Sequence, residues 1–188
     1  AIMEGRRIRR LPVLAGGALV GIVSEGDLKE AQSSVIRDCQ EGAVRRTPVE
    51  AVMRRQVFTA HPLDPIEEAA LVMYQRRIGC LPVVSGGELV GIVTQTDLLR
   101  SLVELMGVNR PGSRLEVQVP DRPGMLARIA DMIRKHDVNI SSVLTLPAEE
   151  AGEKVLVFRL QTIDLRRIAG DIREAGYRIT WPPTLDDT

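Results

Sequence analysis

Aromatic residues and net charge are both scarce in this sequence, and each shortage argues against a class of partner. Aromatic residues make up 3% of the 188-residue chain, which leaves few platforms on which nucleic-acid bases could stack. The formal net charge is zero, and residues 1–107 alone carry 13 basic and 13 acidic side chains. Proteins that bind the phosphate backbone of nucleic acids need a basic excess. We therefore expect no nucleic-acid partner.

Cysteines and long apolar runs are scarce as well. Cys39 and Cys80 are the only cysteines, and they provide neither a disulfide framework nor a metal-binding spacing. No apolar run approaches the roughly 20 residues that a membrane helix requires, and no signal peptide is visible. These observations predict a cytoplasmic protein without a membrane partner.

Catalytic motifs are also missing. The two histidines, His61 and His136, have no neighbours at the spacing of a metal site or a catalytic triad. The sequence contains no P-loop, no nucleophile elbow and no GxGxxG motif. We therefore predict that the chain is not an enzyme and has no catalytic or metal-binding residues.

A duplicated stretch dominates the first half of the chain. Residues 73–98 align on residues 3–28 without a gap, with 16 identities in 26 positions. Each copy contains two short apolar runs separated by a Gly-Gly pair, Gly16-Gly17 in the first copy and Gly86-Gly87 in the second. Glycine supplies the positive φ values that a tight hairpin turn requires. The repeat therefore predicts two similar β-hairpins.

Each copy closes with a hydroxyl residue and, three positions later, an aspartate: Ser24 and Asp27, then Thr94 and Asp97. One interpretation is a capping motif that only starts a helix. The other is a ligand site, because a helix N-terminus suits a phosphate and an ionised carboxylate accepts both hydrogens of a ribose diol. The spacing alone leaves both interpretations open.

The second copy also carries signals for the elements that precede its hairpin. A short strand is expected at residues 57–60. The stretch Asp64-Pro65-Ile66-Glu67 indicates a capping box with proline at the first helical position, and Gly79 is expected to end that helix.

Composition divides the chain into five parts. We expect an N-terminally incomplete first copy, a complete second copy, a linker rich in Gly, Pro, Asn and Ser, a third region and a tail, at residues 1–46, 47–107, 108–114, 115–181 and 182–188. The third region shows the order βαββαβ, which is that of the ferredoxin-like plait. The expected fold class is α/β (α+β), with small mixed sheets and helices in the repeated part.

The repeated part resembles the CBS domain, here as a tandem pair or Bateman module. The resemblance rests on Leu81-Pro82-Val83-Val84 and residues 91–97, with their counterparts in the first copy, and it covers residues 1–108. Residues 113–181 resemble the ACT domain through residues 121–126 and Val138-Asn139-Ile140. A CBS pair followed by an ACT domain is similar to the AcuB family, which is named for acetoin utilisation.

The CBS resemblance implies a regulatory adenine nucleotide such as AMP, ADP or ATP, and no cofactor. The hydroxyl–aspartate pair would hold phosphate and ribose, with adenine among apolar side chains of the hairpin. By this resemblance one site comprises Thr59, Ala60, Ile78, Cys80, Leu81, Pro82, Thr94 and Asp97. The other comprises Arg10, Ser24 and Asp27, beside Ile8, Leu11 and Pro12.

The tandem context favours a nucleotide over a simple helix cap in at least one of these sites. We expect the site of Thr94 and Asp97 to be the better one, because the first copy lacks its opening strand and because Arg10 and Gly26 change its lining. Several Arg-Arg pairs could reach a phosphate, and Arg10 is the arginine that we expect to act on a ligand. These pairs are Arg6-Arg7, Arg9-Arg10, Arg45-Arg46, Arg54-Arg55 and Arg76-Arg77.

The ACT resemblance implies an amino-acid site at a tight turn before a helix, where backbone N–H groups suit a carboxylate. By this resemblance the site comprises Asp121, Pro123, Gly124, Met125, Leu126, Asn139 and Ile140, with Asn139 reaching across to the turn. ACT domains usually bind amino acids between paired domains, so a homodimer is implied. The alternative is an ACT domain that serves dimerisation only.

These resemblances predict a regulatory sensor. It would bind an adenine nucleotide in the CBS pair and an amino acid in the ACT domain, and pass the signal to an unknown partner protein through a population shift. The alternative is a ligand-free homodimerisation scaffold or a regulatory subunit of an acetoin-metabolism system.

Overall fold

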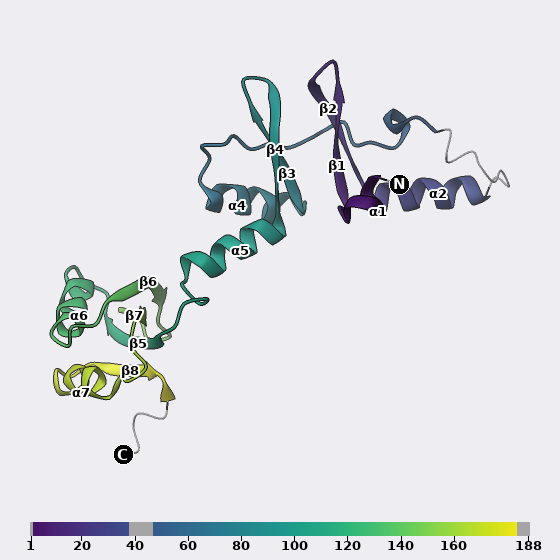
Figure 1. Ribbon diagram of the computed structural model, residues 1–188. Helices are drawn as coiled ribbons and strands as arrows, with labels where there is room; N and C mark the ends of the chain where they lie inside the picture. Colours follow the sequence, from purple (N-terminus) through teal and green to yellow (C-terminus); the bar gives the residue numbers. More distant parts are fainter. Residues whose placement is uncertain (1, 38–46, 184–188) are drawn as a thin grey trace. The chain divides into compact units, whose positions relative to one another are not determined.

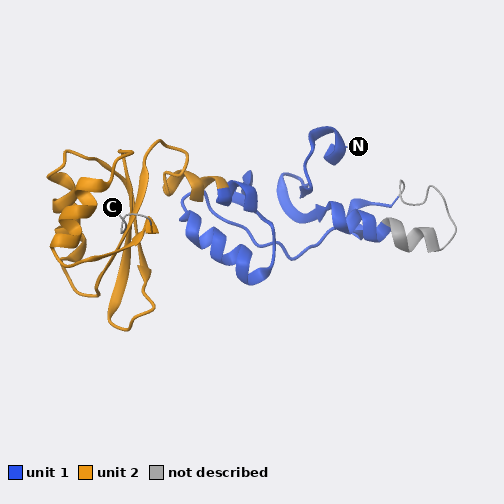
Figure 2. Ribbon diagram, turned by 90° about the horizontal axis from the view of Figure 1, so that it is seen from below, with its two compact units in different colours: residues 1–99 blue, residues 100–188 orange. Residues whose placement is uncertain are grey.

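The computed structural model describes residues 2–37 and 47–183, and the chain divides into two compact units, residues 1–99 and residues 100–188 (Figure 2). Three residues noted above, Cys39, Arg45 and Arg46, lie outside the described residues, as does most of the expected tail. Among the helices in the described ranges, none is both long enough and apolar enough to cross a bilayer.

The first copy of the repeat forms a helix, a hairpin and a second helix: α1 (Ile2–Arg6), β1 (Arg10–Ala15), β2 (Ala18–Ser24) and α2 (Glu25–Arg37) (Figure 1). Strands β1 and β2 pair in antiparallel fashion. Gly16 and Gly17 form the turn with φ values of 57° and 89°, in the left-handed region that glycine tolerates.

The second copy repeats this arrangement with α4 (Ile66–Arg76), β3 (Cys80–Ser85), β4 (Glu88–Thr94) and α5 (Gln95–Leu105). The pairing of Cys80 with Thr94 matches that of Arg10 with Ser24, and both hairpins have an irregularity at the same place in the register. The duplication predicted from the sequence is therefore confirmed in the backbone. A short 3-10 helix, η1 (Val49–Ala51), precedes the second copy.

The connector segment, residues 53–60, is hydrogen-bonded to both hairpins. Arg54 exchanges two backbone hydrogen bonds with Ile22 on β2, at 3.0 and 2.8 Å. Ala60 forms a parallel bridge with Val83 on β3, beside the antiparallel hairpin, so the pairing is mixed, as expected. The strand predicted for the end of this segment is reduced to that single bridge.

Helix α4 starts without the predicted capping box. No side chain caps the helix. The Asp64 carboxylate instead accepts a hydrogen bond from the His61 N–H at 2.7 Å, within the preceding turn. The helix ends at Arg76 and the chain leaves it through Arg77, whose φ is 52°, so the prediction that Gly79 ends the helix is wrong.

Each copy has its own small core. Met3, Val23 and Met53 are buried together in the first copy. The corresponding cluster of the second copy consists of Ala60, Ala69, Met73 and Leu81. Met53 and Ala60 both come from the connector segment, which therefore supplies one core residue to each copy.

Unit 2 contains a four-stranded antiparallel sheet in the order β6-β7-β5-β8. Its elements are β5 (Ser113–Pro120), α6 (Met125–Arg134), β6 (Ile140–Pro147), β7 (Glu153–Leu160), α7 (Arg166–Glu174) and β8 (Arg178–Trp181). Leu115, Val117 and Val119 alternate along β5 and are buried in one core with Ile129 of α6 and Ile172 of α7. The order βαββαβ confirms the predicted ferredoxin-like plait.

Candidate ligand-binding site

Both hydroxyl–aspartate pairs cap a helix. In the first copy, the backbone N–H and the hydroxyl of Ser24 donate to one oxygen of Asp27, and the Asp27 N–H donates back to the Ser24 hydroxyl at 3.2 Å. Thr94 and Asp97 repeat the same three hydrogen bonds, with the corresponding N–H bond at 3.3 Å. Both pairs thus do cap their helices, and whether either also holds a ligand stays a prediction. The capping does not exclude a ligand, because the cap uses only one oxygen of each carboxylate.

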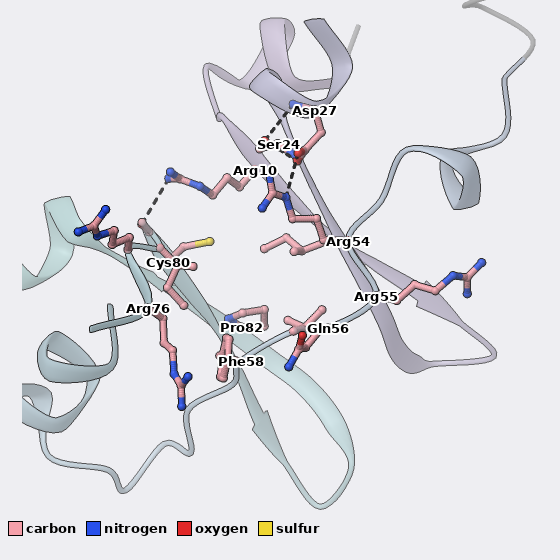
Figure 3. A pocket seen from close by; sticks show the side chains of 15 residues that line it. Arg10, Ser24, Asp27, Arg54, Arg55, Gln56, Phe58, Arg76, Cys80 and Pro82 are labelled. Carbon is pink, nitrogen blue, oxygen red and sulfur yellow. Dashed lines mark hydrogen bonds and ion pairs between the residues drawn. The ribbon is translucent and has the colours of Figure 1, made fainter. Parts of the chain in front are cut away.

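A cavity of about 570 Å³ lies beside the first of these pairs (Figure 3). A cavity of this size is within the usual range for small-molecule sites. It is bordered by the first copy, the connector segment and the second copy. The lining residues are Arg10, Ile22, Ser24, Asp27, Arg54, Arg55, Gln56, Val57, Phe58, Arg76, Arg77, Ile78, Gly79, Cys80 and Pro82.

The alternation of side chains along β3 determines which residues face this cavity. Successive side chains of a strand point to opposite faces. Cys80 and Pro82 line the cavity, whereas Leu81 between them is 1% exposed and belongs to the core of the second copy. One face of this strand therefore contributes to the apolar lining, together with Ile22, Val57, Phe58 and Ile78 from other segments.

Among the described residues that line the cavity, Asp27 alone carries a carboxylate. Its second oxygen accepts a hydrogen bond from Nε of Arg54 at 3.0 Å, which forms an ion pair (Figure 3). Burial alone would raise the pKa of Asp27, but the hydrogen bonds from Ser24 and the guanidinium of Arg54 outweigh burial and lower it. Asp27 is therefore ionised at neutral pH and acts as an acceptor only.

Arg10 reaches across from the first copy to the second. Its guanidinium donates a hydrogen bond to the backbone carbonyl of Gly79 at 3.3 Å (Figure 3). A Cβ at position 79 would overlap this guanidinium, so glycine leaves the room that Arg10 occupies. Burial raises the pKa of the neighbouring Cys80 thiol, and the charge of Arg10 offsets part of that rise.

A second arginine is held against the opposite wall. The guanidinium carbon of Arg76 lies 4.7 Å from the centroid of the Phe58 ring, within the range of a cation–π contact. Phe58 belongs to the connector segment, so this contact joins that segment to the end of α4.

The cavity brings together residues that the sequence assigned to two different sites. Arg10, Ser24 and Asp27 of one predicted site face Ile78, Cys80 and Pro82 of the other. The cavity lies at the first hydroxyl–aspartate pair, whereas the sequence favoured the second pair.

The remaining predicted nucleotide residues are not part of this lining: Thr59, Ala60, Leu81, Thr94 and Asp97. Two of them, Ala60 and Leu81, are core residues of the second copy. The connector segment contributes Arg54, Arg55, Gln56, Val57 and Phe58 to the lining. The sequence singled out the first two only as an Arg-Arg pair, and it assigned none of the five to a site.

Five of the residues predicted to bind an amino acid lie just before or at the start of α6: Asp121, Pro123, Gly124, Met125 and Leu126. The other two, Asn139 and Ile140, lie just before and at the start of β6, beside the Leu160 end of β7 that pairs with Ser113 at the opposite end of β5. Gly124, with φ of 87°, precedes the helix, and no side chain caps it. Asp121 pairs with Lys154 at 3.0 Å. Met125 is buried and Leu126 is exposed.

The sequence suggested that Asn139 reaches across to this turn, but in the structure it does not. Its side-chain oxygen accepts a hydrogen bond from the N–H of Ile140 at 3.0 Å. The three cavities described in unit 2 border Trp181, Tyr177 and Leu144 and none of the residues predicted for the amino-acid site, which stays a prediction. Within residues 2–37 and 47–183, no group of three or more His, Cys, Asp or Glu side chains is placed to hold a metal ion.

Comparison with known proteins finds two domain families in the chain. The CBS domain family matches residues 1–34 and 49–104, and the ACT domain family matches residues 113–176. A CBS domain-containing protein of Dictyostelium discoideum is 32% identical over 110 residues, which cover 55% of this chain and 76% of that protein. A protein of Methanocaldococcus jannaschii is 37% identical over 98 residues, and the match spans 49% of this chain and 35% of that relative's length.

A solved structure from Vibrio cholerae, of a protein assigned by its name to acetoin utilization (AcuB), is also similar. It shares 34% identity with this chain at a TM-score of 0.50, over 58% of this chain and 79% of its own. The repeat, the hairpins, the plait and these matches lead to one conclusion: the chain belongs to the CBS-domain family, as a CBS pair followed by a C-terminal ACT domain.

Proposed function

We propose that this protein is a regulatory sensor that binds an adenine nucleotide in the cavity between its two CBS copies. The observation that carries the proposal is the composition of that cavity. An ionised carboxylate and a hydroxyl at a helix start face Ile78, Cys80 and Pro82 across one space of about 570 Å³. The polar side suits ribose and phosphate, and the apolar side suits a base.

A ligand in this position would contact both hairpins and the connector segment at once. Binding would favour those arrangements of the copies in which all three surfaces fit the ligand, and this population shift is the signal that a partner protein would read. We assign no reaction to the cavity, and the regulated partner is a protein whose identity is open to experiment.

The proposal is tested by thermal unfolding of the full chain with AMP, ADP, ATP, NAD, S-adenosylmethionine and single amino acids. A ligand at 100 times its Kd stabilises a protein by about 2.7 kcal/mol. For a chain of this size such a gain raises the unfolding midpoint by roughly 5–10 °C. The absence of a shift with every adenine-containing compound would sink the proposal and favour a ligand-free homodimerisation scaffold.

Two matched variants locate the site. Asp27→Ala and Asp97→Ala remove the same capping carboxylate from the two copies, so both lower the midpoint without ligand. Only Asp27 lines the cavity. We expect Asp27→Ala to abolish the nucleotide-dependent shift and Asp97→Ala to keep it, and the opposite result would place the ligand at the second pair.

The amino-acid screen addresses the ACT domain. A midpoint shift with one amino acid, lost in Asp121→Ala, would support the predicted site at the start of α6. Sedimentation with and without that amino acid would then show whether the expected homodimer depends on it.

A further inference from the structure

The cavity of unit 1 concentrates positive charge. The described residues that line it include five arginines and one aspartate. Without Arg55, whose side chain points away from the cavity in Figure 3, four arginines still stand against one aspartate, an excess of three positive charges. The chain as a whole is neutral, with 25 basic and 25 acidic side chains. This excess is therefore a local property of the cavity, and low-dielectric walls lined by one sign of charge attract the opposite sign.

Two of these arginines, Arg10 and Arg54, approach the cavity from different walls (Figure 3). Nη1 of Arg10 donates to the Gly79 carbonyl, and Nε of Arg54 donates to Asp27. Each of these interactions uses one nitrogen of a group that carries five N–H donors. The planar fork of arginine matches two oxygens of a phosphate at once. Arg55, in contrast, points away from the cavity in Figure 3.

The ion pair between Arg54 and Asp27 occupies the carboxylate oxygen that the helix cap leaves, which is the oxygen a ribose would need. One oxygen of Asp27 holds the helix cap, and the other accepts the bond from Arg54. The side chain of Arg54 is 73% exposed, so water and salt screen the pair and it is easily broken. The backbone of Arg54 stays bonded to Ile22, so its side chain can change partner without moving the connector segment.

We propose that the cavity selects nucleoside di- and triphosphates over uncharged or cationic adenosine compounds, and that Arg54 exchanges Asp27 for the phosphates of the ligand. The proposal rests on the proposed function and names the ligand class of the same site. In this exchange the departing guanidinium leaves one carboxylate oxygen to the ribose while it binds the phosphates. A ligand without phosphates has to displace Arg54 from Asp27 and provides no new anionic partner for the guanidinium.

Calorimetric titration of the full chain with ATP, ADP, adenosine, S-adenosylmethionine and inorganic tripolyphosphate tests this proposal. We expect ATP and ADP to bind at least roughly tenfold more tightly than adenosine or S-adenosylmethionine, a difference equal to about 1.4 kcal/mol. Tripolyphosphate should bind more weakly than ATP, because it lacks the base and ribose. The preference should shrink as salt is raised, since salt screens exposed charges.

Arg54→Gln is the decisive variant, and the sign of its effect differs between ligands. The substitution should weaken ATP binding by roughly tenfold or more, because a charge-assisted hydrogen bond to phosphate is lost. The affinity for adenosine should stay unchanged or increase, because Asp27 is released from the ion pair. Arg9→Gln is the matched control, since it removes the same charge from an exposed position next to Arg10 that does not line the cavity.

Each outcome separates the two claims. Tight adenosine or S-adenosylmethionine binding that equals ATP overturns the phosphate selectivity and leaves the sensor function standing. If Arg54→Gln lowers the affinities for ATP and adenosine equally, the exchange is overturned. The exchange is also overturned if Arg9→Gln lowers the affinity for ATP as much as Arg54→Gln does. If no adenine compound binds and tripolyphosphate does, the cavity is an anion site only and both proposals fail.

Discussion

Asp27 and Asp97 cap their helices with the same three hydrogen bonds, yet the two copies of the repeat differ in what surrounds these pairs. Beside Asp27 runs the connector segment, which pairs with β2 and brings Arg54 to the carboxylate. Within the described residues, no segment besides β3 pairs with β4. Val90 and Ile92 of that strand are 56% and 39% exposed.

Two glycines at equivalent positions show the same contrast. A Cβ at Gly21 would meet the side chain of Met53 and the carbonyl oxygen of Arg54, the latter at 3.1 Å. A Cβ at Gly91 would come no closer than 3.9 Å to Val83. A motif therefore defines the local geometry of a helix start, but a cavity needs a wall, and the wall comes from a segment outside the repeat.

The largest expected effect concerns the cores of the two copies. Leu81 is 1% exposed, whereas its equivalent Leu11 is half-buried. We expect Leu81→Ala to lower the free energy of unfolding by about 2–4 kcal/mol and Leu11→Ala by about 1–2 kcal/mol. Denaturant unfolding followed by circular dichroism measures both losses, and Trp181, the single tryptophan, reports unit 2 as an internal control. Equal losses would show that the copies are equally well packed.

A smaller effect should follow when each glycine of the comparison is replaced. Gly21→Ala forces Met53 and the connector segment to shift, which costs about 1–3 kcal/mol of stability. Gly91→Ala has room, and removing a strand glycine should be neutral or stabilise by about 0.5–1 kcal/mol. The same denaturation experiment measures both. A stabilising Gly21→Ala would contradict the close approach of the connector segment to β2.

The acid sensitivity of stability offers a third comparison. Because the pKa of Asp27 is lowered in the folded state, its contribution is present above the unfolded pKa and is lost as pH falls through the folded pKa. The unfolding midpoint should therefore fall as pH drops below about 4. Asp27→Asn should flatten that fall, and Arg54→Gln should flatten it partly. A slope unchanged in both variants would mean that Arg54 does not hold the carboxylate in solution.

The smallest effect is expected from the one position where the strand starts differ in charge. Arg10 stands where the second copy has Cys80, and its guanidinium donates a hydrogen bond to the Gly79 carbonyl. Arg10→Gln should change the free energy of unfolding by less than about 1 kcal/mol, because one bond from a half-exposed side chain contributes little. Its effect should appear in nucleotide affinity, and a large loss of stability would instead indicate a structural role.

Much of the fold followed from the sequence, because hairpins and amphipathic elements are encoded locally. The Gly-Gly turns, the alternation of Leu115, Val117 and Val119, and the helix caps at Ser24 and Thr94 all depend on residues a few positions apart. The failed capping box shows the limit of this reasoning. The residues around Asp64 match a capping box, but its carboxylate accepts a hydrogen bond from the N–H of His61 and does not cap the helix.

The candidate site was less accessible to sequence reasoning, because its walls meet only after folding. The CBS resemblance assigned Ile78, Cys80 and Pro82 to the site of Asp97, and in the structure they line the cavity of Asp27. That grouping depends on how the connector segment passes from β2 to β3, which no local pattern specifies. The pair Arg54-Arg55 was visible in the sequence, but nothing in its spacing distinguished the arginine that meets Asp27 from its neighbour.

The connector segment also limits how far the two hairpins can separate. It is bonded to β2 at Arg54 and to β3 at Ala60, with six residue steps between the two attachments. An extended chain spans at most 3.3–3.6 Å per residue, so these attachments cannot be more than roughly 20 Å apart while both hold. The segment acts as a tether of fixed maximum length, and larger excursions of one hairpin from the other require one of its two attachments to break first.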